Sequence, residues 1–291
     1  ITMSDLSKLE LPETQSLILE HRGSVLKIWL NRPEAKNALS EEMTDELHLV
    51  LDAIRDDRSI RTIVLRGKGG VFCAGGDIKG FKSDMQAVSA AQVAKSNRSF
   101  GDLMIKLNEQ PQVVIILVEG AAIGGGLGLA CVADVTLVTA EARFRLSETS
   151  LGIPPAQIAP FVTERVGLTQ ARRLMLTGAR FKGEEAVTLG IAHGVATDTA
   201  DLEAQCQTIL GHIQACAPGA NAVTKGILFE SLRRPRAEAL DFASRGFAYC
   251  MLSPEGLEGV AAFVEKRSAS FAIFMARPLP AKGLQIMVTR F

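Results

Sequence analysis

Two glycine clusters and one carboxylate stand out in this chain as groups that could act together on a carbonyl compound. The clusters are residues 72–77 (FCAGGD) and residues 120–128 (GAAIGGGLG), and each stands just after a β-branched apolar run. Both expose backbone N–H groups that no side chain covers. Glu148 follows the second cluster by about twenty residues. Two N–H donors and one carboxylate can polarise a carbonyl and move a proton beside it.

Each of these features also suits a simpler interpretation. Residue 129 is Leu where a dinucleotide fingerprint needs Gly, and no Lys follows the cluster as in a P-loop, so nucleotide binding is disfavoured. The cluster at 120–128 would also suit a tight turn that packs against a strand. The cluster at 72–77 would suit a turn in which Asp77 caps a helix. Cys73 has apolar or glycine neighbours and no nearby His, which favours a buried inert thiol. Glu148 by itself would suit a surface or capping position. The chemical interpretation therefore depends on Glu148 occurring together with the two glycine clusters.

The composition excludes several classes of protein. The 291 residues are 47% hydrophobic, which is enough for a substantial core. Equal numbers of basic and acidic residues, 32 of each, give no positive field for nucleic acid. The four histidines form no HExxH-type cluster for zinc, and no apolar run reaches membrane-spanning length. Five cysteines without CxxC spacing favour reduced thiols in a cytoplasmic protein.

The elements that must position these groups follow from apolar periodicity. Strands are expected at 15–20, 25–31, 62–65, 113–118, 134–139 and 143–146. A first helix begins after Ser40, whose side chain suits an N-cap, and runs to Ile54. Further helices are expected at 84–109, 126–132, 168–176, 183–189, 201–217, 220–232, 237–252 and 254–267. This order predicts an α/β core followed by a helical C-terminal region.

Together these segments resemble the crotonase superfamily, also called the enoyl-CoA hydratase/isomerase family, from about residue 17 to residue 267. Any one matching motif is weak, but the ordered set is highly specific. The motifs are NRPEAKNAL at 31–39, F-x-A-G-x-D at 72–77, GGG at 124–126, Glu148 with LGIP at 151–154, and PEG at 254–256 with FVEKR at 263–267.

The resemblance implies an α/β fold, a crotonase-like spiral of ββα units with a helical C-terminal region. It divides the chain into a spiral core with the CoA site at 12–200, a helical trimerisation region at 201–270 and an atypical tail at 271–291. It implies an acyl-CoA thioester substrate and assembly as a homotrimer or a dimer of trimers. Coenzyme A is part of the substrate, so no separate cofactor is expected, and no metal, nucleic-acid or membrane partner.

The resemblance also assigns roles to single residues. The backbone N–H groups of Gly76 and Gly125 would form an oxyanion hole, and Glu148 would be the acid and base. Phe263 and Lys266, from the same or a neighbouring subunit, would close the nucleotide end of the CoA groove. The other groove residues would be Arg32, Ala35, Lys36, Ala38, Ala74, Asp77, Ile78, Gly124 and Pro155.

One departure from the family pattern bears on the reaction. Two-carboxylate hydratases of the family carry a Glu where this chain has Gly128. The proton chemistry would then fall to Glu148 alone, as in some hydratases and some enoyl-CoA isomerases of the family. Hydration is therefore the expected reaction. Δ3-Δ2-enoyl-CoA isomerisation and an inactive acyl-CoA-binding protein stay open beside it.

A finer resemblance suggests the substrate. Residues 148–162, 169–174 and 217–225 are similar to branched glutaconyl-CoA hydratases. The isohexenylglutaconyl-CoA hydratases of acyclic terpene breakdown come first, and the 3-methylglutaconyl-CoA hydratases of leucine breakdown come next. A glutaconyl substrate carries a distal carboxylate, which would need a cationic or polar partner in the protein.

Overall fold

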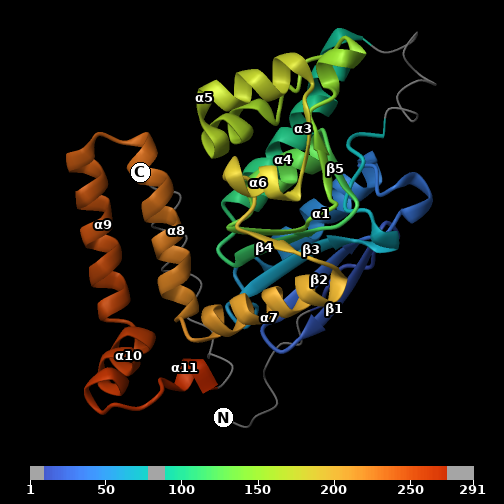
Figure 1. The fold of residues 1–291 in the computed structure, drawn as a ribbon. Coiled ribbons are helices and arrows are strands. Elements are labelled where there is room, and N and C mark those ends of the chain that lie inside the picture. The colour runs from blue at the N-terminus through green and yellow to red at the C-terminus, as the bar shows by residue number, and fades with distance from the viewer. Residues whose placement is uncertain (1–9, 78–88, 274–291) are drawn as a thin grey trace.

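A computed structural model describes residues 10–77 and 89–273 of the chain (Figure 1). Its strands are β1 Leu17–Arg22, β2 Val25–Leu30, β3 Thr62–Gly67, β4 Val113–Val118, β5 Ala121–Ile123, β6 Val135–Thr139, β7 Arg143–Arg145, β8 Arg180–Lys182 and β9 Gly194–Ala196. Its α-helices are α1 Glu41–Ile54, α3 Ala90–Asn108, α4 Gly125–Val132, α5 Ala159–Thr177, α6 Gly183–Thr188, α7 Thr199–Gln214, α8 Pro218–Arg233, α9 Arg236–Met251, α10 Pro254–Val264 and α11 Ser270–Ile273. Short 3-10 turns occur at η1 Pro33–Ala35, η2 Lys68–Gly70 and η3 Glu148–Leu151.

The larger sheet separates two apolar cores. Its strand order is β1-β2-β3-β4-β6-β9, and all neighbours are parallel except β1 with β2. Val114 and Ile116 of β4 face the core shared with α1, α3 and α4, whereas Ile115 and Leu117 face α7 (Figure 1). A strand covered on both faces needs a continuous apolar sequence, which explains the VVIILV of β4.

The first helix shows how local sequence sets an element. The side chain of Ser40 accepts a hydrogen bond from the N–H of Met43, as expected of an N-cap. Glu41 and Glu42 lie in the first turn, where the helix dipole favours negative charge. Five apolar residues of α1 recur at helical spacing and are buried: Met43, Leu47, Val50, Leu51 and Ile54.

Several elements differ from the sequence expectation. The predicted helix at 168–176 is part of the longer α5, which bends at Gly167, a residue with φ of 73°. The strands β5, β8 and β9 were not predicted, because three residues are too few to show alternation. β5, β7 and β8 form a separate small sheet, with β5 parallel and β8 antiparallel to β7.

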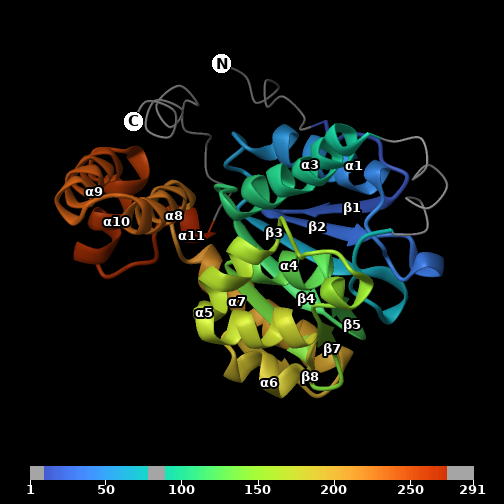
Figure 2. The same ribbon diagram turned by 90° about the horizontal axis from the view of Figure 1, so that it is seen from above.

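The helices α8, α9 and α10 project from the core as an arm, called here the C-terminal arm, residues 218–264 (Figures 1 and 2). Lys225 of α8 ties its base to the core: Nζ donates to the carbonyl oxygens of Gln110 and Gln112 at 2.8 and 2.7 Å and pairs with Asp134 at 2.5 Å. Burial lowers the pKa of Lys225, and Asp134 opposes this shift. No helix among the described residues is both long and apolar enough to cross a membrane.

Candidate active site

Strand β5 holds the two glycine clusters side by side. Cys73 N–H donates to the carbonyl of Ala121 at 3.0 Å, and Ile123 N–H donates to the carbonyl of Cys73 at 3.0 Å. The clusters then approach closely at Gly75, whose φ is 97°. A Cβ added at Gly75 would lie 3.0 Å from the carbonyl oxygen of Ile123 and 3.8 Å from the backbone nitrogen of Gly125. The chain therefore needs glycine at this crossing.

The N–H of Gly76 is left available by the pairing around it. Leu39 N–H donates to the carbonyl of Gly75 at 2.8 Å, and Asp77 N–H donates to the carbonyl of Leu39 at 3.0 Å. The residues flanking Gly76 thus make the hydrogen bonds, and within the described chain the N–H of Gly76 makes none. A Cβ added at Gly76 would meet nothing within 4 Å, so the space beside its Cα is open.

The second donor belongs to the first residue of α4. Gly124 is the N-cap, with φ of 51° and ψ of −118°, and its own N–H donates to the carbonyl of Arg145 at 2.9 Å. The first N–H groups of a helix have no partner within the helix, so the N–H of Gly125 is available to a ligand. The helix dipole adds partial positive charge there, which suits a developing oxyanion.

Glu148 places its carboxylate against the same helix end. Its Oε1 would lie 2.6 Å from a Cβ at Gly124, so the carboxylate packs where only a glycine leaves room. Its Oε2 is buried with no hydrogen-bond partner in the described chain. Burial raises the pKa of Glu148, and the backbone N–H groups of residues 147 and 148 offset part of this shift. A carboxyl group with a raised pKa is suited to take up and return a proton near neutral pH.

The predicted CoA groove is built from two loops that Arg32 holds together. Its Nη1 donates to the carbonyl of Ala38 at 2.8 Å, and its Nη2 pairs with Asp77 at 2.9 Å. Ala74 N–H donates to the carbonyl of Lys36 at 3.0 Å, which joins the same loops a second time. Arg32 and Asp77 therefore join these two loops through their mutual ion pair.

Asn37 is a structural residue of this groove that the sequence reasoning missed. It is fully buried with φ of 54°, and its side-chain amide donates to the carbonyls of Lys68 and Val71 at 2.9 and 2.6 Å. Its Oδ1 accepts from the N–H of Arg32 at 2.9 Å. Asn tolerates the left-handed conformation better than most residues, and that preference was the available signal within the 31–39 motif.

Other predicted site residues lie apart or outside the description. Pro155 is buried shortly after η3, and Ala35 ends η1. Ile78 lies outside the described residues. Phe263 lies on α10, and Lys266 follows that helix, so within one chain the C-terminal arm keeps both away from β5 and α4 (Figure 2). Phe263 is 85% exposed.

The position of a second acid is filled by packing. A Cβ added at Gly128 would lie 2.4 Å from Cγ2 of Ile158 and 3.3 Å from Cε of Met104. Gly128 is itself buried inside α4. Ile158 thus takes the space through which a longer side chain would enter, and Glu148 is the carboxylate that reaches this helix end.

We expect Gly128→Ala to destabilise the protein by about 1–3 kcal/mol, since an added methyl group would overlap Ile158. Gly128→Glu should cost more, because it also buries a charge, and it should not speed hydration. Denaturant unfolding measures both effects. The double variant Gly128→Ala with Ile158→Ala should lose less stability than the sum of the two single losses, because the smaller side chain at 158 leaves room for the added methyl group. An unchanged unfolding midpoint in Gly128→Ala alone would contradict the packing argument.

Two other features carry no chemistry of this kind. Cys73 is fully buried, and burial raises the pKa of its thiol to about 12, which makes it a poor nucleophile. No group of His, Cys, Asp and Glu side chains in the described ranges could hold a metal ion. Glu148 is the titratable side chain that the described chain packs against the N-terminal end of α4.

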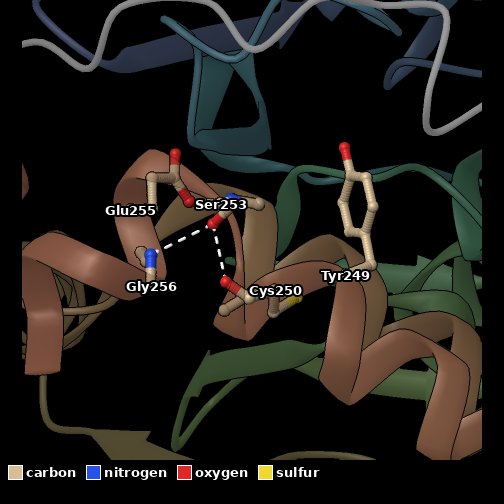
Figure 3. Close-up of a pocket in the computed structure, with 8 residues that line it drawn as sticks. Tyr249, Cys250, Ser253, Glu255 and Gly256 are labelled. Carbon is tan, nitrogen blue, oxygen red and sulfur yellow. Dashed lines mark hydrogen bonds between the residues drawn. The ribbon is translucent and has the colours of Figure 1, made fainter.

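The residues that line a small pocket in the C-terminal arm cap the N-terminal ends of two helices (Figure 3). Ser253 Oγ accepts from Gly256 N–H at 3.0 Å and donates to the carbonyl of Cys250 at 2.7 Å. Glu255 Oε2 accepts from Gly219 N–H at 2.9 Å, at the start of α8. These bonds cap α10 and α8, so the pocket is a junction of the arm, remote in the fold from Glu148.

Known proteins are similar to this chain over most of its length. The family model described as enoyl-CoA hydratase/isomerase matches residues 20–273. A short-chain-enoyl-CoA hydratase of Clostridium acetobutylicum is 31% identical over 263 residues, covering 88% of this chain and 97% of that protein.

Solved structures are similar over the same extent. Pseudomonas aeruginosa AtuE is 50% identical with a TM-score of 0.87, covering 89% of this chain and all of that one. An enoyl-CoA hydratase/isomerase from Marinobacter aquaeolei is 45% identical with a TM-score of 0.85, covering 88% of this chain and 99% of that one.

Proposed function

The chain belongs to the enoyl-CoA hydratase/isomerase family, and we propose that it hydrates an α,β-unsaturated acyl-CoA with Glu148 as its single acid and base. The observation that supports the proposal is the packing of the Glu148 carboxylate against Gly124 at the start of α4, where Gly75 also approaches Gly125. The enzyme would be a hydro-lyase. Coenzyme A enters as part of the substrate, so the step needs no separate cofactor.

In the proposed step, the thioester oxygen lies between the N–H groups of Gly76 and Gly125. These donors stabilise the negative charge that develops on the oxygen as water adds to the β-carbon. Glu148 accepts a proton from that water and returns a proton to the α-carbon. The addition is balanced, because the oxygen and both hydrogens of one water end in the product.

Isomerisation of a Δ3-enoyl-CoA is the second candidate reaction, and the packing at Gly128 is the observation that favours it. With Ile158 in place of a second acid, one carboxylate can shuttle a proton between two carbons without adding water. Turnover in ¹⁸O-labelled water separates the two reactions. Label in the product supports hydration, whereas a shifted double bond without label supports isomerisation.

The acyl group that we propose is a branched glutaconyl group, with isohexenylglutaconyl-CoA first and 3-methylglutaconyl-CoA second. The support is the sequence similarity over 148–162, 169–174 and 217–225. Turnover of crotonyl-CoA, 3-methylglutaconyl-CoA and isohexenylglutaconyl-CoA tests the choice. Highest kcat/KM on crotonyl-CoA would contradict it while leaving the hydratase proposal intact.

We also propose that the chain assembles as a homotrimer or a dimer of trimers through the C-terminal arm. The arm exposes large apolar side chains that a monomer would leave in water, which is typical of an interaction surface. Assembly would also let Phe263 and Lys266 of one subunit reach the groove of another. The exposed residues are Leu228, Leu232, Leu240, Phe247, Leu252, Leu257, Phe263 and Val264.

Light scattering after size exclusion should therefore give the mass of a trimer or hexamer. Leu252→Glu should shift the protein toward monomer, because Leu252 is 76% exposed on the arm and needs a partner to be covered. Leu49→Glu is the matched control, since Leu49 is 57% exposed on α1, outside the arm. A monomeric wild-type protein, or equal behaviour of the two variants, would contradict the proposed assembly.

A further inference from the structure

Arg145 is a cation whose place in the small sheet is not explained by strand pairing. On β7 it lies directly opposite Arg180 of β8, and like charges in such a pair are unfavourable. Within the described chain it forms no ion pair with a carboxylate. Its guanidinium instead donates to neutral oxygens. Because the like-charge pair with Arg180 is unfavourable, we expect the role of Arg145 to lie in its hydrogen bonds to Gly178 and Ser150.

The backbone of Arg145 fixes the start of α4. Its carbonyl oxygen accepts the N–H of Gly124 at 2.9 Å, and Gly124 is the N-cap of that helix. The next N–H along the chain is that of Gly125. Strand β7 therefore sets the direction of one of the two donors of the oxyanion hole.

The side chain of Arg145 holds the turn that carries Glu148. Its Nη2 donates to Oγ of Ser150 at 3.2 Å, and that hydroxyl donates to the carbonyl of Ser147 at 2.6 Å. Its Nε donates to the carbonyl of Gly178 at 3.1 Å. Gly178 is the C-cap of α5, where unpaired carbonyls and the helix dipole both favour a positive charge.

A second bond fastens the same turn to the same helix end. Thr149 Oγ1 donates to the carbonyl of Met175 in the last turn of α5 at 2.9 Å. Ser147 and Thr149 flank Glu148, so both of its neighbours are tied down. Arg145 does not act on the charge of Glu148 directly, because the shift in the pKa of that carboxyl comes from burial and from backbone N–H groups.

We propose that Arg145 is a positioning residue, which fixes the carboxylate of Glu148 relative to the N–H of Gly125 by joining η3 and the N-cap of α4 to the C-terminal end of α5. This role rests on the proposed function of Glu148 and Gly125. Within β7, Arg145 combines a backbone bond to Gly124, next to the donor Gly125, with a side-chain bond to Ser150, in the turn that carries Glu148.

The test compares Arg145→Met with Arg143→Met, a matched control. Arg143 lies on the same strand and is exposed, and the contact of its guanidinium within the described residues is long, 3.5 Å to the carbonyl of Gly120. Arg145→Met should lower kcat by about 10²-fold, the cost of displacing a catalytic group by about 1 Å, with KM within a few-fold of wild type. The acid limb of its pH–kcat profile should move to lower pH, because a loosened Glu148 regains water.

Arg145→Lys is the second variant, and it decides the matter if Arg145→Met does not fold. Lysine keeps the charge but lacks the fork that serves Gly178 and Ser150 together, so an intermediate loss of kcat at an unchanged melting temperature is expected. A kcat for Arg145→Lys or folded Arg145→Met within threefold of Arg143→Met would overturn the proposal. So would a loss of kcat with the pH profile unmoved.

Failure of the proposed function gives a different result. If the wild-type protein turns over no enoyl-CoA on the substrate panel, the proposed function is wrong, whatever the Arg145 variants do. If the wild-type protein isomerises without adding water, the same variants are measured on that reaction. Glu148 would carry the proton there too, so the same loss of kcat and the same shift of the acid limb are expected.

Discussion

Glu148→Gln is expected to lower kcat for hydration by about 10⁴-fold while acyl-CoA binding is retained. General acid–base groups typically contribute about 10²–10⁴-fold, and the upper end applies because one carboxylate performs both proton transfers. With Gly128 packed against Ile158, no second acid enters through that position to compensate. The rate is followed by the loss of enoyl-CoA absorbance, and binding is measured separately by calorimetry with a saturated acyl-CoA.

The same variant should unfold at the same temperature as wild type or at a higher one. Oε2 of Glu148 is buried without a hydrogen-bond partner in the described chain, and burial raises the pKa of the group. A carboxyl whose folded-state pKa lies above its unfolded value destabilises the protein once the pH rises above the unfolded value. Replacing it with a neutral amide removes that cost. Hydration within a few-fold of wild type, with binding intact, would contradict the assignment.

The pH dependence of the wild-type protein follows from the same shift. Glu148 must be ionised to accept a proton from water, so kcat should fall as the pH drops through its pKa in the complex. Because that pKa is raised, the fall should begin at a higher pH than for a solvated Glu. The acid limb should be absent from the residual activity of Glu148→Gln.

The fold was predictable wherever a pattern extended over enough residues. The helix after Ser40 and the continuous apolar strand at 113–118 appear at the expected places because burial imposes a period on long elements. The strands β5, β8 and β9 have three residues each, and pairing with distant segments defines them. Such pairing leaves no local signature in the sequence.

The N–H donors and Glu148 are predictions from the family motifs, whereas the residues that support them left no signal in the sequence. The structure packs the carboxylate of Glu148 against Gly124 and brings Gly75 close to Gly125 at the start of α4. Ile158 filling the space beside Gly128, and Arg145 reaching Gly178, depend on contacts between segments about 30 residues apart or more. The residue types alone do not show to which oxygen an arginine donates or which side chain packs beside a glycine. Only the fold therefore identifies the roles of Arg145 and Ile158.

Gly125→Pro is expected to lower kcat by about 10²–10³-fold, the usual cost of losing one donor of an oxyanion hole. Proline has no N–H, and its fixed φ suits the first position of a helix, which is the position of Gly125 in α4. The substitution therefore removes the donor at a helix position that proline commonly occupies. Steady-state hydration kinetics measure the effect, with circular dichroism to check that the helices are retained.

Gly125→Ala is the control that separates the lost donor from the added side chain. Its Cβ would lie 3.0 Å from Cδ1 of Leu39 and 3.3 Å from Cζ of Phe100, the ends of side chains that can move by a few tenths of an ångström. Alanine keeps the N–H, so its kcat should stay within about tenfold of wild type if the donor dominates, a smaller loss than removal of a donor costs. Equal losses in the two variants would mean that crowding at Leu39 and Phe100, and not the N–H of residue 125, limits the reaction.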